Sequence, residues 1–489
     1  LKEGIINEPS NSRYHFYLAN SYHDTGKYED AIEWYKKRIE MGGWKEEVWY
    51  SYYRIGLCYK NLEKFEHALS TWLEAYNYYP ERLEGIYEII KHYRFNSKNK
   101  LCIEFYKMIK DNLDSNVKRN EYLFLHNSVY TYKIYYEYSI FAYYCGIRNI
   151  NNEVIKIFNN CSDAAELNKL LSNMKFYKFI LKQSNVKNFD DKIKSDVMGI
   201  QDTVFNSSSS CLIKKPNSSN YLMNVRYVNY YIEPNGTYKN CEKHIVTINK
   251  FMELDKDLNM VRSSNMELIQ DGRRYMGVED VKIYWDNYSN NLLHVGTGFH
   301  VSNKIGVVGG NYSLEQNKLF PIELTQNFAK TTCEKNWVYV DYSGSTHIIY
   351  DWHPMRICKL NESNELELVQ TIQTPKIFSR IRGSTCGFVY DPKPESGSDA
   401  NTHQIWFINH IVSYETPRHY YHVITVFDSN MNLIKYTAPF KFEGESIEYC
   451  LSLVVEDSRV LINYSTWDRT TRIGTYDKNY IDELLIYTP

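Results

Sequence analysis

Two adjacent acidic residues stand at the entrance to an apolar strand. Glu279 and Asp280 follow Gly277 and precede the segment Val281-Lys282-Ile283. Successive side chains of a strand point to opposite faces, so one of the two acids can be structural while the other faces the centre of a domain. A carboxylic acid in a partly dry pocket has a raised pKa and can donate a proton to a leaving glycosidic oxygen. The pair therefore predicts either a general acid or a salt bridge to Lys282.

Three basic positions further along the chain have the chemistry of phosphate recognition. Arg382 lies beside Gly383, Ser384 and Thr385, so it offers a guanidinium together with hydroxyl groups. His410 is followed by Arg418–His422, without an acidic or Cys partner at metal-ligand spacing, and Lys335 precedes a strand. We therefore expect Lys335, Arg382 and His410 to bind phosphate, and we expect no metal site. A charged surface loop is the alternative for Arg382.

Aromatic and polar residues at strand ends suggest contacts with a sugar. Trp467 stands next to Asp468, and such a pair can cover the apolar face of a sugar ring while the carboxylate holds its hydroxyl groups. Ordinary packing at the rim of the domain is the alternative. The sugar-binding candidates are Arg226, Trp337, His353, Tyr421, Trp467 and Asp468.

The strands that must position these residues carry a repeated turn mark after about residue 190. An apolar strand, an Asp or Asn and a short polar turn recur at Asp255, Asn311, Asn361, Asp428 and Asp477. Five such marks suit five four-stranded blades, so we predict a five-bladed β-propeller over residues 191–489. Asp255-Lys256-Asp257 also matches the DxD motif of nucleotide-sugar glycosyltransferases. Because it occupies a repeated turn, we interpret it as a turn.

The N-terminal part repeats in a different way. Residues 18–43 and 55–80 share a pattern in which Ala31 and Tyr35 recur as Ala68 and Trp72, at an offset of 37 residues (68 − 31 = 37). The pattern resembles tetratricopeptide repeats, whose period is about 34 residues. A third copy follows with Cys102, a degenerate fourth is expected at 134–160, and a capping helix at 163–183. We predict repeats over 1–110 and further helices over 111–190, which could hold a protein partner or an upstream domain.

Composition sets the remaining limits. A chain of 489 residues suggests two or three domains, and a net charge of −2 gives no reason to expect nucleic acid as a partner. No apolar run approaches 18 residues, and the ten Cys form no CxxC pair, so we expect a cytoplasmic protein without a membrane span. The sequence contains no P-loop, HExxH or GxSxG motif, and we expect no cofactor. The start at Leu1, in what reads as the end of a helix, suggests a further upstream segment.

The order of these clusters resembles glycoside hydrolase family 130, the five-bladed propeller mannoside phosphorylases, and the related propeller mannosyltransferases. Their blade-entry motif Glu-Asp-Pro-Arg corresponds here to Glu279-Asp280-Val281-Lys282. The resemblance implies that Asp280 is the general acid. Val281 and Lys282 depart from the motif, as does the loop Arg382–Gly387 that stands for the family's phosphate loop. The helical part is similar to repeats of giant-virus glycosyltransferases, which implies the host cytoplasm as the location.

The resemblance implies an inverting enzyme of glycan biosynthesis, either a glycosyltransferase or similar to a glycoside phosphorylase. Asp280 would serve as general acid or base, with a carbohydrate, sugar phosphate or nucleotide sugar as substrate. One protein acid suffices if phosphate or an acceptor hydroxyl is the nucleophile. The alternatives are a non-catalytic glycan-binding propeller that supports an upstream glycosyltransferase, and an interaction scaffold.

Overall fold

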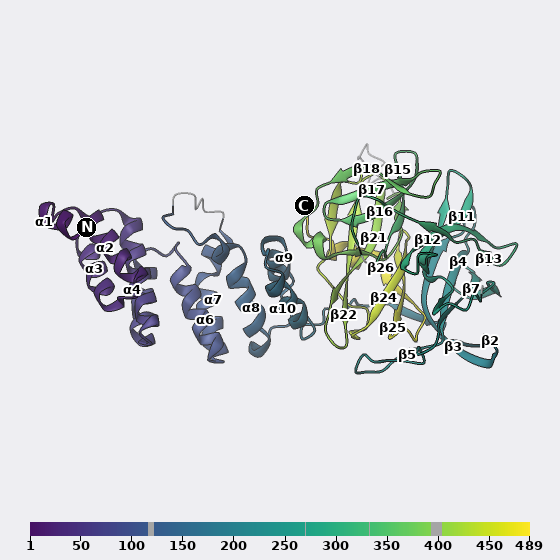
Figure 1. Cartoon of the computed structure of the whole chain (residues 1–489), viewed down its shortest axis with the longest axis horizontal. Helices are drawn as coiled ribbons and strands as arrows, with labels where there is room; N and C mark the ends of the chain where they lie inside the picture. The colour runs from purple at the N-terminus through teal and green to yellow at the C-terminus, as the bar shows by residue number, and fades with distance from the viewer. Residues whose placement is uncertain (116–121, 269, 332, 393–402) are drawn as a thin grey trace. The chain divides into compact units, whose positions relative to one another are not determined.

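The protein folds into two compact units, Leu1–Tyr177 and Lys178–Pro489. The computed structural model describes residues 1–115, 122–268, 270–331, 333–392 and 403–489. The first unit is helical and the second consists mainly of strands (Figure 1). Among the described residues, no helix combines the length and the apolar character needed to cross a membrane.

The first unit is an array of antiparallel helix pairs. Its helices are α1 (Lys2–Asn7), α2 (Ser12–Asp24), α3 (Tyr28–Glu40), α4 (Lys45–Asn61), α5 (Phe65–Tyr78), α6 (Glu84–Phe95), α7 (Asn99–Asp114), α8 (Ile134–Phe141), α9 (Asn151–Asn160) and α10 (Ala164–Met174). A π-helical turn, Val129–Lys133, leads directly into α8. The predicted repeats correspond to the pairs α2–α3 and α4–α5, and α6–α7 is the third copy.

Small and large residues alternate where paired helices meet. Ala31, Tyr35, Ala68 and Trp72 are all fully buried. A β-carbon at Gly56 would lie 2.1 Å from the Trp72 Nε1 atom, so only glycine leaves room for this indole between α4 and α5. The spacing in the sequence therefore reflects direct helix-to-helix packing.

The helical array ends earlier than the sequence suggests. We expected a capping helix over 163–183, but α10 ends at Met174. The chain passes into the second unit at Lys178, where the Leu181 amide donates a hydrogen bond to the Lys441 carbonyl at 3.0 Å. Beyond Lys178 the chain is extended because Ile180 forms a β-bridge with Lys441, and local propensity did not reveal that partner.

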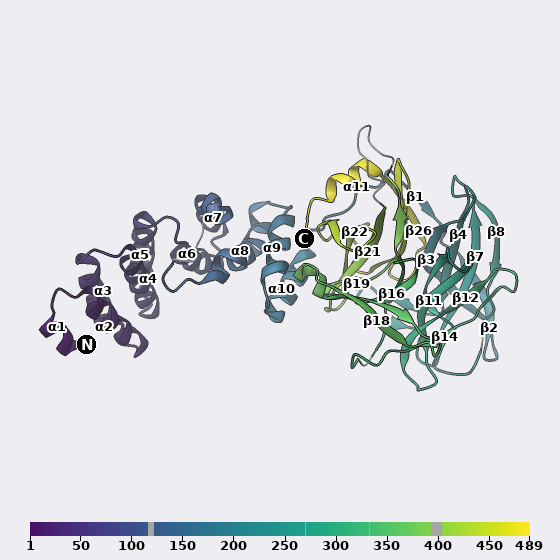
Figure 2. The same cartoon turned by 90° about the horizontal axis from the view of Figure 1, so that it is seen from above.

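The second unit is a five-bladed β-propeller (Figure 2). The first blade contains β3 (Ile200–Lys214), β4 (Tyr221–Val228), β7 (Ile245–Leu254) and β8 (Met260–Asn265), with β2 (Lys192–Val197) added beside β3 and β9 (Tyr275–Met276) beside β7. The second contains β10 (Glu279–Asp286), β11 (Asn291–Phe299) and β12 (Ile305–Ser313), flanked by β13 (Lys318–Leu319) and β14 (Ile322–Leu324). A short hairpin, β5 (Tyr231–Ile232) and β6 (Tyr238–Lys239), follows β4.

The remaining three blades follow in sequence order. The third contains β15 (Val338–Tyr342), β16 (Ser345–Trp352), β17 (Met355–Leu360) and β18 (Leu366–Ile372). The fourth contains β19 (Arg382–Gly383), β20 (Phe388–Tyr390), β21 (Gln404–Ser413), β22 (His419–Phe427) and β23 (Leu433–Tyr436). The fifth contains β24 (Glu448–Val455), β25 (Arg459–Thr466), β26 (Arg472–Asp477) and β1 (Asn185–Asn188), and helix α11 (Lys478–Leu484) follows it.

The fifth blade joins the two ends of the propeller. Strand β1 comes from its start, and it pairs antiparallel with β26 from its end, with Asn185 opposite Thr475. Such pairing removes the free edge that an open ring of blades would leave.

The turn marks recur in the structure with two exceptions. At Asp255, Asn361 and Asp428 the side chain accepts hydrogen bonds from the amides two and four residues later, at 2.7–3.0 Å. Each lies between the third and fourth strands of its blade. Asn311, however, lies within β12 just before the equivalent turn, and Asp477 is the N-cap of α11. Asp255 is a turn residue, in accordance with our interpretation of the DxD motif.

Candidate active site

A β-bulge determines how the Glu279–Asp280 pair is presented. The pairing of β10 with β11 shifts register between Glu279 and Lys282, and Asp280 has a left-handed backbone with φ of 51°. Both carboxylates consequently face the Arg226 guanidinium, at 2.8 Å from Asp280 and 3.5 Å from Glu279. The expectation that strand alternation would send them to opposite faces is therefore wrong, because the bulge interrupts the alternation.

Arg226 connects Asp280 to a second aspartate through a tyrosine. It lies on β4 and is 3% exposed. Its Nη2 group donates to the Tyr230 hydroxyl at 3.3 Å, and that hydroxyl donates to the Asp468 carboxylate at 2.8 Å. The Ser209 hydroxyl donates to Asp280 at 3.3 Å, from a bulged stretch of β3. We call Ser209, Arg226, Tyr230, Glu279, Asp280 and Asp468 the Asp280 cluster.

The two aspartates of the Asp280 cluster have pKa values shifted in opposite directions. Burial acts to raise the pKa of Asp280, but the charges of Arg226, Lys282 and Lys335 outweigh it and the pKa lies below its usual value. For Asp468 burial prevails, the Asp280 charge adds to it, and the pKa is raised. Such a separation distinguishes a carboxylate that is ionised at neutral pH from one that holds its proton more readily.

Two lysines add positive charge around the Asp280 cluster. Lys335 is exposed, and its charge acts on both aspartates. Lys282, in contrast, is 2% exposed and its pKa is lowered by burial. Lys282 stands where the Glu-Asp-Pro-Arg motif has arginine, and it lies within the fold. It therefore does not form the salt bridge to Glu279 or Asp280 that the sequence offered as an alternative, and Arg226 has that role.

The remaining phosphate-binding candidates lie on the fourth blade. Arg382 on β19 pairs directly with His410 on β21. The buried His410 ring places Nδ1 2.7 Å from the Ser384 hydroxyl. Burial, together with the charges of Arg382 and Lys282, lowers the pKa of His410 to about 3, although Asp280 acts in the opposite direction. His410 is therefore neutral at physiological pH and within electrostatic range of Asp280.

Trp467 and Asp468 occupy a strained turn between β25 and β26. Both have left-handed backbones, with φ of 55° and 51°. A bulky residue rarely adopts this conformation unless its surroundings enforce it, and such strain is enriched at functional sites. The Trp467 indole donates to the Glu445 carboxylate at 2.8 Å.

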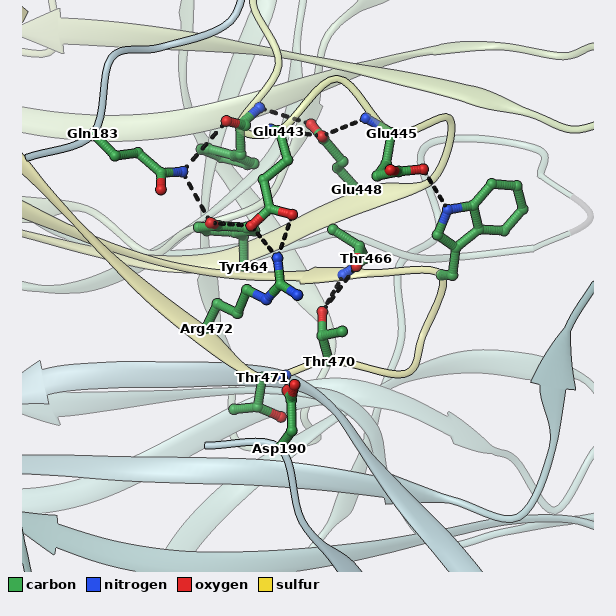
Figure 3. A network of polar contacts seen from close by, with 12 residues as sticks. Gln183, Asp190, Glu443, Glu445, Glu448, Tyr464, Thr466, Thr470, Thr471 and Arg472 are labelled. Atoms are coloured by element: carbon green, nitrogen blue, oxygen red, sulfur yellow. Dashed lines mark hydrogen bonds and ion pairs between the residues drawn. The ribbon is translucent and has the colours of Figure 1, made fainter. Parts of the chain in front are cut away.

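A buried glutamate holds the segment 442–445 in place. The Glu448 carboxylate is fully buried and accepts hydrogen bonds from the amides of Phe442, Glu443 and Glu445 at 2.7–2.9 Å (Figure 3). Arg472 forms an ion pair with Glu443 in the same network. Glu448 thus fixes the segment from which Glu445 reaches Trp467.

We predicted Tyr421 as a sugar-binding residue, but its neighbour Tyr420 is the tyrosine that lies beside His410. Tyr421 is 2% exposed and its ring lies 4.9 Å from the Lys441 ammonium group. Tyr420 points to the other face of β22, where its ring packs 5.9 Å from His410 and 6.1 Å from Tyr449. Adjacent residues of a strand face opposite ways, so the sequence identified the right strand and the wrong neighbour.

Two further sugar-binding candidates differ in their surroundings. Trp337 is 1% exposed and packs in the core with Tyr339 and Ile348, so its ring has no open face for a sugar. His353 lies in the turn between β16 and β17, with Nδ1 3.2 Å from the Thr374 hydroxyl. We do not retain Trp337 as a sugar contact, whereas His353 stays a prediction.

The comparisons with known proteins concern each part of the chain separately. A model for tetratricopeptide repeats matches residues 12–41 and 50–82, which confirms the resemblance of the helical part. No curated protein matches the chain.

Solved structures matched by the chain include three enzymes that act on mannosides or mannose. A beta-1,2-mannobiose phosphorylase from Listeria innocua has a TM-score of 0.40 at 11% identity, covering 62% of this chain and 99% of that one. A mannose phosphorylase from Leishmania mexicana, in complex with phosphate, has 0.33 at 8%, covering 62% and 94%. A GDP-Man-dependent mannosyltransferase from the same organism has 0.31 at 9%, covering 59% and 90%.

Proposed function

We propose that the propeller transfers a glycosyl group from a phosphate-linked donor to a hydroxyl group of an acceptor glycan, with inversion. The observation that carries this proposal is the Asp280 cluster, in which an ionised carboxylate is held beside a second carboxyl group and several cations. Asp280 would act as the general base on the acceptor. Lys335, Arg382 and His410 would bind the phosphate of the donor.

The charge state of Asp280 favours synthesis over cleavage. A general acid must hold a proton before the reaction, whereas a general base must be free of it. The pKa of Asp280 is lowered because Arg226 and two lysines outweigh its burial, so the group is ready to accept a proton at neutral pH. The general-acid role implied by the motif would then apply only to the reverse reaction.

The proposed step balances in atoms and charge. The acceptor oxygen forms a bond to the anomeric carbon while its proton passes to the Asp280 carboxylate. The bond between the anomeric carbon and the phosphate oxygen breaks, and the phosphate departs with the electron pair. Cations near the leaving group would stabilise the charge that develops there.

We propose that the sugar binds beside Trp467 and Asp468, in the turn that the fifth blade contributes to the site. Asp468 and Trp467 would contact hydroxyl groups and the apolar face of the sugar, as a carboxylate beside an aromatic ring commonly does. Tyr230 and Tyr420 add hydroxyl groups on the same side, since the charge of Asp468 acts on both tyrosines.

The test measures transfer with the full chain. Purified protein is incubated with mannose, glucose or galactose 1-phosphate, or with the corresponding nucleotide sugars, together with oligosaccharide acceptors, and the product is quantified. We expect turnover with at least one donor, and we expect Asp280→Asn to lower kcat by roughly 100-fold or more, the usual contribution of a general base.

Asp255→Asn is the matched control. It makes the same chemical change at an exposed turn, and Asn361 already performs the same turn role elsewhere in the propeller. Equal turnover by Asp280→Asn and the control variant would refute the role of Asp280. Glycan binding without turnover on any donor would instead favour the non-catalytic propeller.

A further inference from the structure

A cavity of about 170 Å³ lies between the first and second blades, outside the Asp280 cluster. We call it the side cavity. Its lining includes Thr247 and Asn249 from β7, Glu267 and Asp271 from the segment after β8, Arg273, and Phe299 at the end of β11. Pockets for drug-sized ligands are about 300–1,000 Å³, so the side cavity suits a single ring-sized group.

The side cavity lies next to the surroundings of Asp280. A smaller cavity of about 10 Å³ shares Tyr275, Gly277, Gly298 and Phe299 with it and is also lined by Glu279. The Glu279 carboxylate lies 3.5 Å from the Arg226 guanidinium, which holds Asp280. A chain-like ligand with one unit at Asp280 would pass over this shared wall and place its next unit in the side cavity.

A glycine allows close packing in the wall that the two cavities share. Gly277 has a left-handed backbone with φ of 84°, and a β-carbon there would lie 2.0 Å from the Thr247 carbonyl oxygen. The chain from β9 to β10 can therefore run directly against β7, and it forms one wall of both cavities.

The polar groups of the side cavity indicate a neutral ligand rich in hydroxyl groups. Arg273 is the one cation among its described lining residues, and it is already bound to the Asp271 carboxylate and to the Phe299 carbonyl. Glu267 is paired with Lys318 at 3.1 Å and Glu323 lies 3.7 Å from His300, so the described lining offers no uncompensated cation for a phosphate group. The Thr247 hydroxyl, 1% exposed, has no hydrogen-bond partner among the described residues. A buried hydroxyl in that state is suited to a ligand that donates or accepts a hydrogen bond.

An aromatic surface completes the arrangement. The Phe299 and Tyr275 rings lie 5.6 Å apart at 31°, and the Arg273 guanidinium lies 5.6 Å from the Phe299 ring. Aromatic faces cover the apolar C–H side of a sugar ring while carboxylates and hydroxyl groups bind its polar edge.

From this geometry we infer that the side cavity binds a second saccharide unit of the acceptor glycan, beyond the unit whose hydroxyl group reacts. The inference rests on the proposed function for the identity of the acceptor. It implies that the protein prefers acceptors of two or more sugar units over monosaccharides.

The test separates this binding from catalysis. In the unreactive Asp280→Asn background, monosaccharide and oligosaccharide acceptors are titrated by calorimetry, with and without Phe299→Ala or Thr247→Val. We expect tighter binding of the oligosaccharide, and we expect Phe299→Ala to weaken it at least roughly five-fold, as the loss of one aromatic contact would. Monosaccharide affinity should stay unchanged.

Tyr288→Ala is the matched control, since Tyr288 is 52% exposed in the turn between β10 and β11 and lines neither cavity. Thermal unfolding of each variant shows whether it is folded, and Thr247→Val keeps the side-chain shape if Phe299→Ala is unstable. Equal oligosaccharide affinity in the control and both cavity variants would overturn the inference. Because no turnover is needed, failure of the proposed transfer reaction would appear separately, as oligosaccharide binding without product by the protein that retains Asp280.

Discussion

The Tyr230 hydroxyl donates a hydrogen bond to the Asp468 carboxylate at 2.8 Å, while it lies 3.3 Å from the Arg226 guanidinium. Arg226 in turn binds Asp280 at 2.8 Å. The chain of contacts joins the first and second blades to the fifth, which is distant from them in sequence. It allows the charge of one aspartate to influence the protonation of the other.

Removal of the Tyr230 hydroxyl should weaken that coupling. In Tyr230→Phe, Asp468 loses a hydrogen bond that helps to lower its pKa, so its pKa should rise further. We expect kcat/KM to fall several-fold and the unfolding free energy to fall by about 1 kcal/mol, the usual contribution of one hydrogen bond. Steady-state kinetics and denaturant unfolding provide the measurements. Tyr288→Phe is the control, and identical kinetics for the two variants would contradict the coupling.

The sequence predicted the architecture better than the site. The spacing of Ala31 with Ala68 and of the turn residues Asp255, Asn361 and Asp428 reflects packing and hydrogen bonds that repeat with the chain, so the pattern can be read locally. Tyr230 was missed because its role depends on Asp468, which is distant in sequence. No local signal distinguishes it from the other tyrosines.

The sequence predicted least well which face of a strand each side chain occupies. Tyr421 and Tyr420 differ only by which face of β22 they occupy, and Trp337 is chemically as suitable for a sugar as Trp467. The phase of a strand is set by its register with neighbours, and a bulge such as the one at Asp280 resets it. A single sequence does not specify that register.

Substitution of the two aspartates should have opposite effects on stability. The lowered pKa of Asp280 means that its ionisation stabilises the fold above its unfolded value of about 3.9 and that this stability is lost as pH falls. The raised pKa of Asp468 means that stability declines as pH rises from about 3.9 through the folded value. Asp280→Asn should therefore cost roughly 3 kcal/mol at pH 7, because it breaks a buried ion pair, whereas Asp468→Asn should be neutral or stabilising.

Thermal unfolding of both variants at pH 7 and pH 4.5 gives the measurement, with Asp255→Asn alongside. The difference between the two variants should shrink at the lower pH, because the native protein then loses less from the buried charge of Asp468, whereas the contribution of Asp280 declines only below about pH 3.9. A lower Tm for Asp468→Asn than for Asp280→Asn at pH 7 would reverse the assignment of charge states.

Glu448 should support sugar binding without touching the sugar. Glu448→Gln replaces one of the two accepting oxygens by an amide NH2 group that faces backbone N–H donors. The substitution should lower the free energy of unfolding by about 1–3 kcal/mol. The loop that carries Glu445 would loosen, and Trp467 would lose its fixed position. We expect a higher KM for the glycan with a smaller change in kcat.

The exposed Glu362 provides a control for this change through Glu362→Gln. Combining Glu448→Gln with Trp467→Phe tests whether the two residues act together. If the effects on KM are additive, Glu448 has a general structural role and does not act through Trp467.

Three buried histidines should make the propeller sensitive to mild acid. Burial lowers the pKa of His294 to about 4 and of His410 to about 3, and it lowers that of His422 well below its usual value. A histidine in the unfolded chain has a pKa near 6.5. As pH falls, the unfolded state therefore binds protons at these histidines before the folded state does. The free energy of unfolding is therefore highest above about pH 6.5 and declines below it, by roughly 1 kcal/mol for each histidine between pH 7.5 and 5.5.

Denaturant unfolding of the full chain across that range measures how steeply the free energy of unfolding depends on pH. His294→Gln should reduce the slope by about a third, whereas His403→Gln, at a side chain that is 56% exposed, should leave it unchanged; equal slopes for both variants would show that burial of His294 is not the cause.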